Sequence, residues 1–323
     1  MSLTTAVLVS LFAANPTEAS FPPLPSKLSS FGAASCGDHV YVYGGHTGKT
    51  HQYSSGDISG RFFRAPLGGG NWEELPGGPG MQGLAFLSHQ GKLYRLGGMQ
   101  PRNKPGEKAN NVSLKSCAVY DPAARKWSDL PDLPEARSSF EAVAVGNKLF
   151  VLGGWNMQGG KVDWHGTGLV LDLQNPTKWQ SIDQPFRRRA LGAAVLGEKI
   201  YVIAGLGEEA SSQQVDVYDP ASGKWTKGPD FPGGTRNGFS PAAAVVSNRL
   251  YASGPDGKVH RLTADGSGWE QVGKQQVKRS VHRVVPGPTE TLIVLGGAAE
   301  SDEASRRVEV IPLKESARSS AAR

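Results

Sequence analysis

A short apolar strand that ends in a pair of small residues returns six times along this chain of 323 residues. The pairs are Gly44-Gly45, Gly97-Gly98, Gly153-Gly154, Ala204-Gly205, Ser253-Gly254 and Gly296-Gly297. A tryptophan follows each of the first five pairs, and the spacings between these tryptophans are 55, 52, 46 and 44 residues: Trp72, Trp127, Trp179, Trp225 and Trp269. Self-similarity at a nearly fixed period predicts about six copies of one structural unit.

Each copy predicts four antiparallel strands. In the fourth copy a small-residue strand at 191–196 precedes an alternating apolar strand at 199–203. A third strand at 215–219 ends in a turn before Trp225, and a short fourth strand follows. Four strands per copy, repeated around an axis, form the blades of a β-propeller. The small side chains on the first strands fit the crowding near such an axis: Ala33, Ala34, Ala193, Ala194, Ala243 and Ala244.

These features resemble the kelch repeat, whose pattern is the glycine pair, a tyrosine on the third strand and a tryptophan after the next turn. The resemblance covers residues 18–313 and implies an all-β, six-bladed β-propeller of four-stranded kelch-like blades. Ala204 and Ser253 depart from the pattern by replacing the first glycine, and no tryptophan follows Gly297. With 42 glycines, 22 prolines and 20% charged residues, the composition agrees with a turn-rich all-β domain.

The last copy ends at 308–313 as a third strand, so its blade needs a fourth strand from elsewhere. Residues 18–25 align with 127–134, which precede the first strand of the third copy. We therefore predict that an N-terminal strand completes the sixth blade and closes the ring, which removes an exposed sheet edge.

The ends of the chain are expected to lie outside the propeller. Residues 1–17 form an apolar segment that is signal-like or disordered and too short to span a membrane, and 314–323 form a polar tail expected to be disordered. We expect a bacterial, secreted or periplasmic monomer, with a cytoplasmic location as the alternative. Cys36 and Cys117 fall on different blades and are predicted to be separate thiols.

The connection pattern predicts where a ligand binds. In a four-stranded meander, the loops between strands two and three share one face with the blade-to-blade loops. The longest of the former are 46–60, 99–112 and 155–168, which predict an asymmetric wall around the axial opening, the usual ligand site of a propeller.

Arginines precede the inner strands of blades three to six and are expected to form a ring of guanidinium groups at this opening. With a net charge of +6 and a pI near 9.2, they favour an anionic partner. The alternative is that they tie adjacent blades together through Glu141, Glu135 or Asp183. The hairpin at 155–165 carries two indoles, a carboxylate and an imidazole, which match the needs of a sugar site unless they fold back onto blade three. The ligand-binding candidates are Arg137, Trp155, Asp163, Trp164, His165, Arg188, Arg189, Arg236, Arg279 and His282.

Metal and cofactor chemistry has little support in the sequence. The seven histidines include no pair four residues apart and form no Cys/His cluster, so we expect no metal and no cofactor. Galactose-oxidase-like copper enzymes share the propeller, but they need a tyrosine crosslinked to a cysteine and axial histidines, an arrangement that Cys36 and Cys117 do not offer.

A second resemblance gives an enzymatic alternative. Residues 72–79 and 92–98 are similar to segments of bacterial sialic-acid mutarotases (N-acetylneuraminate epimerases), although these segments are kelch framework. This resemblance implies a general acid or base, for which Glu141, Glu208 and Glu209 are the candidates, and an arginine for the sugar carboxylate. The leading interpretation remains a binding module for a protein or carbohydrate ligand, anionic in character, with no nucleic-acid partner.

Overall fold

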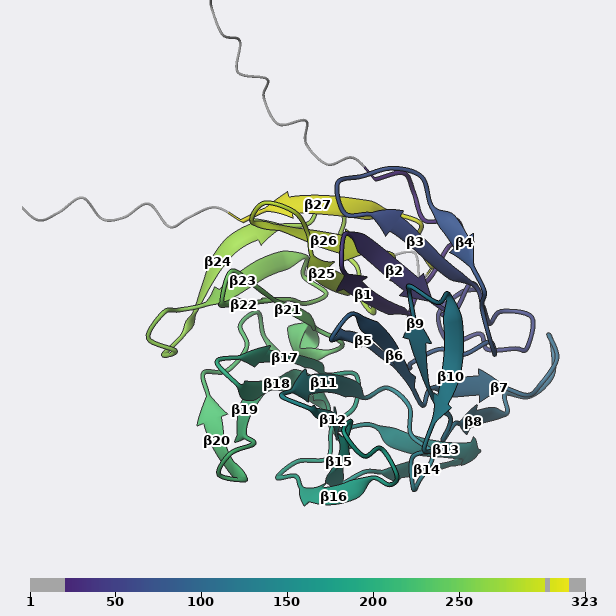
Figure 1. Cartoon of the computed structure of the whole chain (residues 1–323), viewed down its shortest axis with the longest axis horizontal. Coiled ribbons are helices and arrows are strands. Elements are labelled where there is room, and N and C mark those ends of the chain that lie inside the picture. Colours follow the sequence, from purple (N-terminus) through teal and green to yellow (C-terminus); the bar gives the residue numbers. More distant parts are fainter. Residues whose placement is uncertain (1–20, 300–302, 314–323) are drawn as a thin grey trace, which may run out of the picture.

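The computed structural model describes residues 21–299 and 303–313. The predicted N-terminal segment 1–17 and tail 314–323 lie outside these residues. Six sheets follow one another around a common axis (Figure 1), and each runs from an inner to an outer strand. Blade one contains β1 (Gly32–Cys36), β2 (His39–Tyr43), β3 (Phe62–Pro66) and β4 (Glu73–Leu75). Blade two contains β5 (Ala85–His89), β6 (Lys92–Leu96), β9 (Cys117–Asp121) and β10 (Lys126–Leu130).

The remaining blades repeat this order. Blade three contains β11 (Glu141–Val145), β12 (Lys148–Leu152), β15 (Thr167–Asp172) and β16 (Gln180–Asp183). Blade four contains β17 (Gly192–Leu196), β18 (Lys199–Leu206), β19 (Ser211–Asp219) and β20 (Lys224–Gly228). Blade five contains β21 (Ala242–Val246), β22 (Arg249–Ser253), β23 (Lys258–Leu262) and β24 (Trp269–Lys274), preceded by a short 3-10 helix, η1 (Thr235–Gly238). Blade six contains β25 (Arg283–Pro286), β26 (Thr291–Leu295) and β27 (Val308–Pro312).

The inner strands close the ring. Strands β1, β5, β11, β17, β21 and β25 contact one another in this order, and β25 contacts β1. The predicted all-β propeller is therefore confirmed. The glycine pairs permit close packing between blades: Gly153 has a φ of 70°, and a Cβ atom there would lie 2.5 Å from the carbonyl oxygen of Arg188 in the next blade.

The repeated tryptophans fasten each blade to the one before it. The indole Nε1 of Trp179 donates to the carbonyl of Pro131 at 2.9 Å, and Trp127, Trp225 and Trp269 make equivalent bonds to Pro76, Asp183 and Pro229. In blade one, Trp72 donates to the carbonyl of Pro22 at 3.1 Å. The N-terminal segment therefore takes the place of a preceding outer strand, in the register that the sequence predicts.

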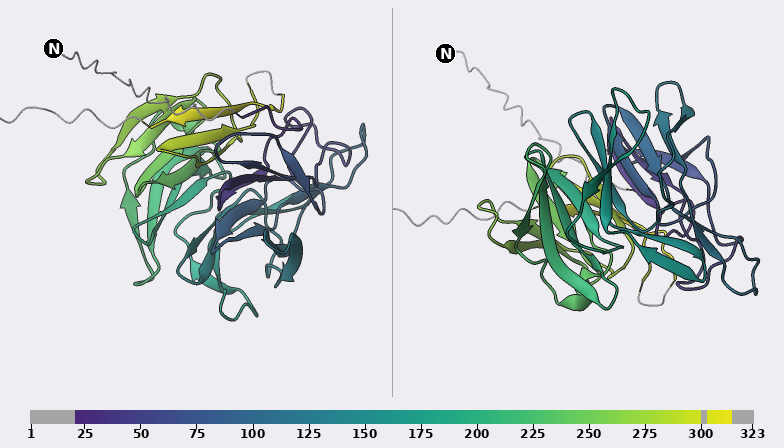
Figure 2. Two further views of the ribbon diagram at one scale, coloured as in Figure 1. Left: turned by 45° about the horizontal axis from the view of Figure 1, so that its top comes forward. Right: turned by 90° about the horizontal axis from the view of Figure 1, so that it is seen from below.

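The N-terminal segment meets blade six, as Figure 2 shows where purple residues lie beside the yellow strands. Leu24 N–H donates to the carbonyl of Arg306 at 2.7 Å, and Leu28 N–H donates to Ser305 at 3.0 Å. Of the predicted closing strand 18–25, residues 18–20 lie outside the described part. Residues 21–25 close the ring without a continuous ladder, since the prolines among them lack the amide hydrogen that a ladder requires: Pro22, Pro23 and Pro25.

A seventh sheet was not expected from the sequence. It contains β7 (Met99–Pro101), β8 (Asn111–Ser113), β13 (Trp155–Gly159) and β14 (Lys161–Trp164), in the order β14-β13-β8-β7. These strands belong to the long loops of blades two and three, so two loops of neighbouring blades combine into one wall beside the axis.

A belt of backbone hydrogen bonds surrounds the axis beneath this wall. Six residues in the left-handed conformation, with φ from 46° to 58°, form it: Ser30, Gly83, Ser139, Ala190, Ser240 and Val281. Each of the first five donates its N–H to the carbonyl of the preceding member, with Ser30 donating to Val281, at 2.7 to 3.2 Å. Among the described residues, the bond from Val281 to Ser240 is missing, so this axial belt is open between blades five and six.

Candidate binding site at the axial opening

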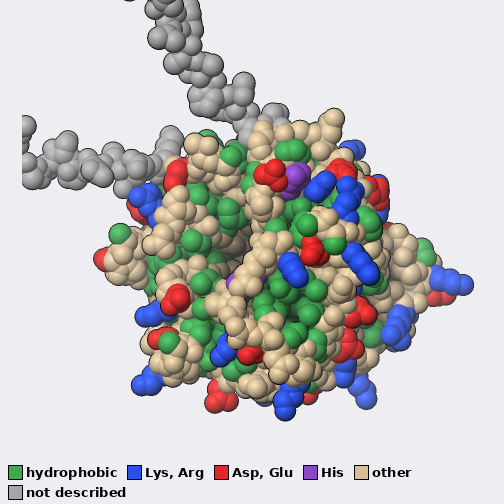
Figure 3. Space-filling model, viewed as in Figure 1, with side chains coloured by type: hydrophobic (Ala, Val, Ile, Leu, Met, Phe, Trp, Pro, Cys, Tyr) green, Lys and Arg blue, Asp and Glu red, His purple; other side chains and the backbone are tan. Residues whose placement is uncertain are grey.

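The two sets of loops line a cavity of about 590 Å³ at one end of the axis, which we call the axial cavity. Figure 3 shows the other face of the ring, viewed as in Figure 1, and a hollow near its centre marks the opposite end of the axis. Segments that follow the small-residue pairs contribute His46, Tyr53, Met99, Asn111, Trp155 and Leu206. Segments that precede the inner strands contribute Gln82, Arg189, Arg236 and Phe239. Both sets of loops therefore meet on one face, as the meander predicts.

Arg189 is the central cation of this cavity. Its guanidinium carbon lies 3.8 Å from the centroid of the Trp155 ring and 5.8 Å from that of Trp164. The two indoles, on β13 and β14, meet edge to face at 5.5 Å. Burial lowers the pKa of Arg189 to about 10, still well above neutral pH, although nearby Tyr53 acts in the opposite direction. No carboxylate of the described residues pairs with Arg189, so its charge is stabilised by the ring and left without a counter-ion.

Four buried polar atoms of the lining residues have no hydrogen-bond partner in the described chain. They are Gln82 Nε2, Asn111 Oδ1, Trp155 Nε1 and Arg189 Nε. Each of these atoms is almost completely shielded from solvent, and an unpaired buried polar atom costs about 1–3 kcal/mol. The lining includes Arg189 and Arg236 but neither Asp nor Glu among the described residues. This cavity can therefore hold a polar, anionic group.

Three predicted arginines lie elsewhere. Arg137 donates from Nη1 to the carbonyls of Gly153 and Thr167 at 2.9 and 3.0 Å, and Arg188 donates to the Gln214 carbonyl at 2.6 Å and pairs with Asp216. Each side chain is buried within its own blade. They and Arg279 stand four residues before an inner strand, whereas Arg189 stands three before and reaches the opening. The predicted ring of guanidinium groups is therefore wrong, since only two of its arginines line the cavity.

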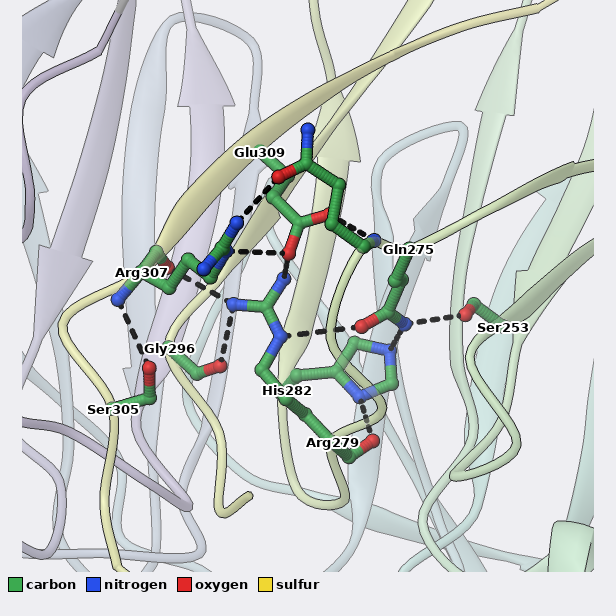
Figure 4. A network of polar contacts seen from close by, with 9 residues as sticks. Ser253, Gln275, Arg279, His282, Gly296, Ser305, Arg307 and Glu309 are labelled. Carbon is green, nitrogen blue, oxygen red and sulfur yellow. Dashed lines mark hydrogen bonds and ion pairs between the residues drawn. The ribbon is translucent and has the colours of Figure 1, made fainter. Parts of the chain in front are cut away.

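Figure 4 shows how Arg279 and His282 are used in blade six. Arg279 donates to Glu309 at 2.9 Å, to Gln275 Oε1 at 3.2 Å and to the Gly296 carbonyl at 3.1 Å. His282 Nδ1 donates to the Arg279 carbonyl at 2.9 Å, and its Nε2 accepts from Gln275 Nε2 at 3.2 Å. Burial, with the charge of Arg279, lowers the pKa of His282 to about 3. Both residues therefore stabilise the blade.

The remaining candidates are dispersed. His165 is buried against the Ala136 carbonyl at 3.1 Å, and Asp163 is exposed on β14. Glu208 is exposed 3.8 Å from Arg187, and Glu209 is exposed beside it.

Glu141 lies inside the axial channel, where it pairs with Arg283. The alternative interpretation, that arginines tie blades together through acidic residues, therefore holds for Arg283 and Glu141. This ion pair joins blade six to blade three, on the opposite side of the ring, and not to an adjacent blade. None of the three candidate carboxylates lines the axial cavity.

Several lining residues could not be predicted from the sequence. His46, Tyr53 and Asn111 belong to the long loops that the repeat pattern predicts, but nothing in the local sequence shows which side chains face the axis. Gln82 in blade two and Arg189 in blade four occupy equivalent positions. Each forms a β-bridge with the residue that follows the small-residue pair of its blade, Met99 or Leu206. Comparing this position between the copies could have found both.

Within the described ranges, no group of three or more His, Cys, Asp and Glu residues could hold a metal ion. In the same ranges no helix is long and apolar enough to cross a membrane. Cys36 and Cys117 are free thiols on different blades, as predicted, and burial raises the pKa of Cys117 to about 12.

Residues 136–166 and 187–232 match the family model described as Kelch motif. Kelch-like protein 35 of Mus musculus is 26% identical over 226 residues, which are 68% of this chain and 34% of that protein. Kelch-like protein terF of Aspergillus terreus is 27% identical over 248 residues, which are 72% of this chain and 50% of that protein. The chain thus spans half or less of the length of these curated relatives.

The solved structure entitled "Structure of YjhT" shares the fold. It has a TM-score of 0.73 and 16% sequence identity, over 91% of this chain and 97% of that chain. The repeated glycine pairs, the closed ring of sheets and these similarities agree: the chain is a kelch-repeat β-propeller.

Proposed function

We propose that this propeller is a protein-binding module whose axial cavity holds an acidic group of a peptide segment of its partner. Kelch propellers generally mediate protein binding. The observation that carries the proposal is Arg189, a largely buried cation that stacks on Trp155 and has no counter-ion among the described residues. A ligand carboxylate would supply that counter-ion through charge-assisted hydrogen bonds.

The polar groups of the cavity suit a peptide better than a sugar. The Trp155 ring is covered by Arg189 on one side and meets the edge of Trp164, so it offers little free surface for stacking a sugar ring. Gln82 Nε2 is an unsatisfied donor and Asn111 Oδ1 an unsatisfied acceptor. The two side chains thus carry the donor and the acceptor types that pair with a peptide group.

The test is a binding assay with eight-residue peptides of Gly, Ser and Ala that carry one Asp or Glu, made with an amidated or a free C-terminus. We expect Arg189→Met to weaken binding of the acidic peptides at least about tenfold, the loss of about 1.4 kcal/mol. Arg249→Met, which removes an exposed charge at the start of β22, is the matched control and should bind as wild type does. Comparing the two C-termini tells whether the acidic group is a side chain or a terminal carboxylate.

Equal binding by Arg189→Met and wild type would refute the proposal. The mutarotase-like alternative is measured in parallel by proton NMR of freshly dissolved α-sialic acid. Faster anomer exchange with wild type, and its loss in Arg189→Met, would favour that enzymatic function over peptide binding.

A further inference from the structure

A second cavity lies between blades five and six, on the same face of the ring. Its volume is about 450 Å³, and we call it the radial slot. Its lining includes Asn237, Asp256 and Ala298. Arg236, Pro255 and Ser280 line both the radial slot and the axial cavity, so the two spaces adjoin.

The radial slot lies between the same two blades as the opening in the axial belt. Every other neighbouring pair of belt residues is joined by a backbone hydrogen bond, whereas Val281 and Ser240 are not joined within the described residues. These two residues belong to blades six and five, the blades that form the slot. The seam between these blades is therefore less tightly fastened at the axis than the other five.

The radial slot is also positively charged. Arg236 and Lys278 are exposed along it, and neither side chain has an ion pair or hydrogen bond to any described residue. The third cation of its lining, Arg279, is neutralised by Glu309. The carboxylate of Asp256 accepts the Lys258 N–H at 2.9 Å, and it is the only acidic group among the described lining residues. Within the described part of the chain, these two cations thus have no counter-ion.

We infer that the radial slot is a second acidic subsite of the same binding site. The bound peptide runs from the axial cavity outwards between blades five and six, with one carboxylate at Arg189 and a second one at Arg236 and Lys278. This inference rests on the proposed function, and it adds the chemical class of the partner segment: an extended chain with two separated acidic residues. A compact ligand with one charge would use the axial cavity alone.

The test uses amidated peptides that carry either one Glu or two Glu residues separated by one to five Gly or Ser residues. The proteins are wild type, Arg189→Met, Lys278→Met and the matched control Lys274→Met, which removes an exposed lysine at the end of β24. Wild type should bind the best two-Glu peptide at least about tenfold more tightly than any one-Glu peptide. Lys278→Met should remove most of this gain without changing affinity for one-Glu peptides, and Lys274→Met should change neither.

The outcomes separate the two proposals. If one-Glu peptides bind in a way that depends on Arg189 but a second Glu adds nothing at any spacing, the radial slot is not a subsite and the proposed function stands. If Lys278→Met keeps the higher affinity for the two-Glu peptide, the radial slot is likewise not the second acidic subsite. If Arg189→Met binds every acidic peptide as wild type does, the proposed function itself fails.

Discussion

Arg188 and Arg189 are neighbours with the same chemistry and opposite environments. Arg188 pairs with Asp216 inside blade four, and Arg189 stacks on Trp155 at the opening. The run 187–189 is evident in the sequence, but which of its side chains reaches the axis depends on a single position along an extended backbone. The general location of the candidate site could therefore be predicted, whereas the choice between these two arginines needed the structure.

Arg283 joins four blades with one side chain. From blade six it donates to the carbonyls of Phe31 at 2.7 Å and Leu84 at 3.3 Å, and it pairs with Glu141. Removing it leaves the partly buried carboxylate of Glu141 without its partner. Breaking a fully buried pair costs about 3–5 kcal/mol, and this pair lies at the low end because its side chains are 20% and 16% exposed. We expect Arg283→Met to lower the free energy of unfolding by about 3 kcal/mol, measured by urea denaturation.

The double variant is the control for this pair. Arg283→Met with Glu141→Gln should lose clearly less than the two single losses added together, because the two groups interact directly. Additive losses would show that the pair contributes little. Burial raises the pKa of Glu141, so in Arg283→Met the deficit relative to wild type should shrink as the pH falls and the carboxyl takes up a proton.

The blades and the loop-built sheet differ in how far the sequence predicts them. Local sequence patterns predict each blade: the glycine pair, the alternating apolar residues and a turn before tryptophan. Strands β8 and β13 pair through Gln158 and Val112, which belong to different blades. No local pattern specifies such a pairing, so the long loops were expected but their sheet was not. The N-terminal register was predictable because residues 18–25 repeat an internal segment.

Closure of the ring by the N-terminal segment predicts a stability effect at Leu24. This side chain is fully buried in the cluster that also contains Val40 and Ile293, from blades one and six. Leu24→Ala should lower the free energy of unfolding by about 3 kcal/mol, as expected for a buried leucine. Val162→Ala on β14, where the side chain is 44% exposed, should cost less than about 0.5 kcal/mol. If Leu24→Ala unfolds at the same urea concentration as wild type, the N-terminal segment does not stabilise the closed ring.

Buried histidines make the whole propeller sensitive to acid. Burial lowers the pKa of His46, His165, His260 and His282, and that of His282 falls to about 3. Between the unfolded pKa of about 6.5 and the lower folded values, the unfolded chain binds more protons. Stability is therefore complete above about pH 6.5 and is lost as the pH falls towards 3. His282→Asn, which keeps a donor for the Arg279 carbonyl, should show a shallower loss of Tm between pH 6.5 and 4; an unchanged slope would exclude His282 as a source.

The backbone contact between Leu24 and Arg306 also fixes when the molecule can become complete. Its partners stand near opposite ends of the described chain, so a ribosome must synthesise almost all of it before the contact can form. Until then the earlier blades form an open arc whose two ends expose apolar surface, including the surroundings of Trp72. We therefore expect nascent and truncated chains to need chaperones more than finished ones do, and a premature stop within blade six to yield an aggregating product rather than a five-bladed domain.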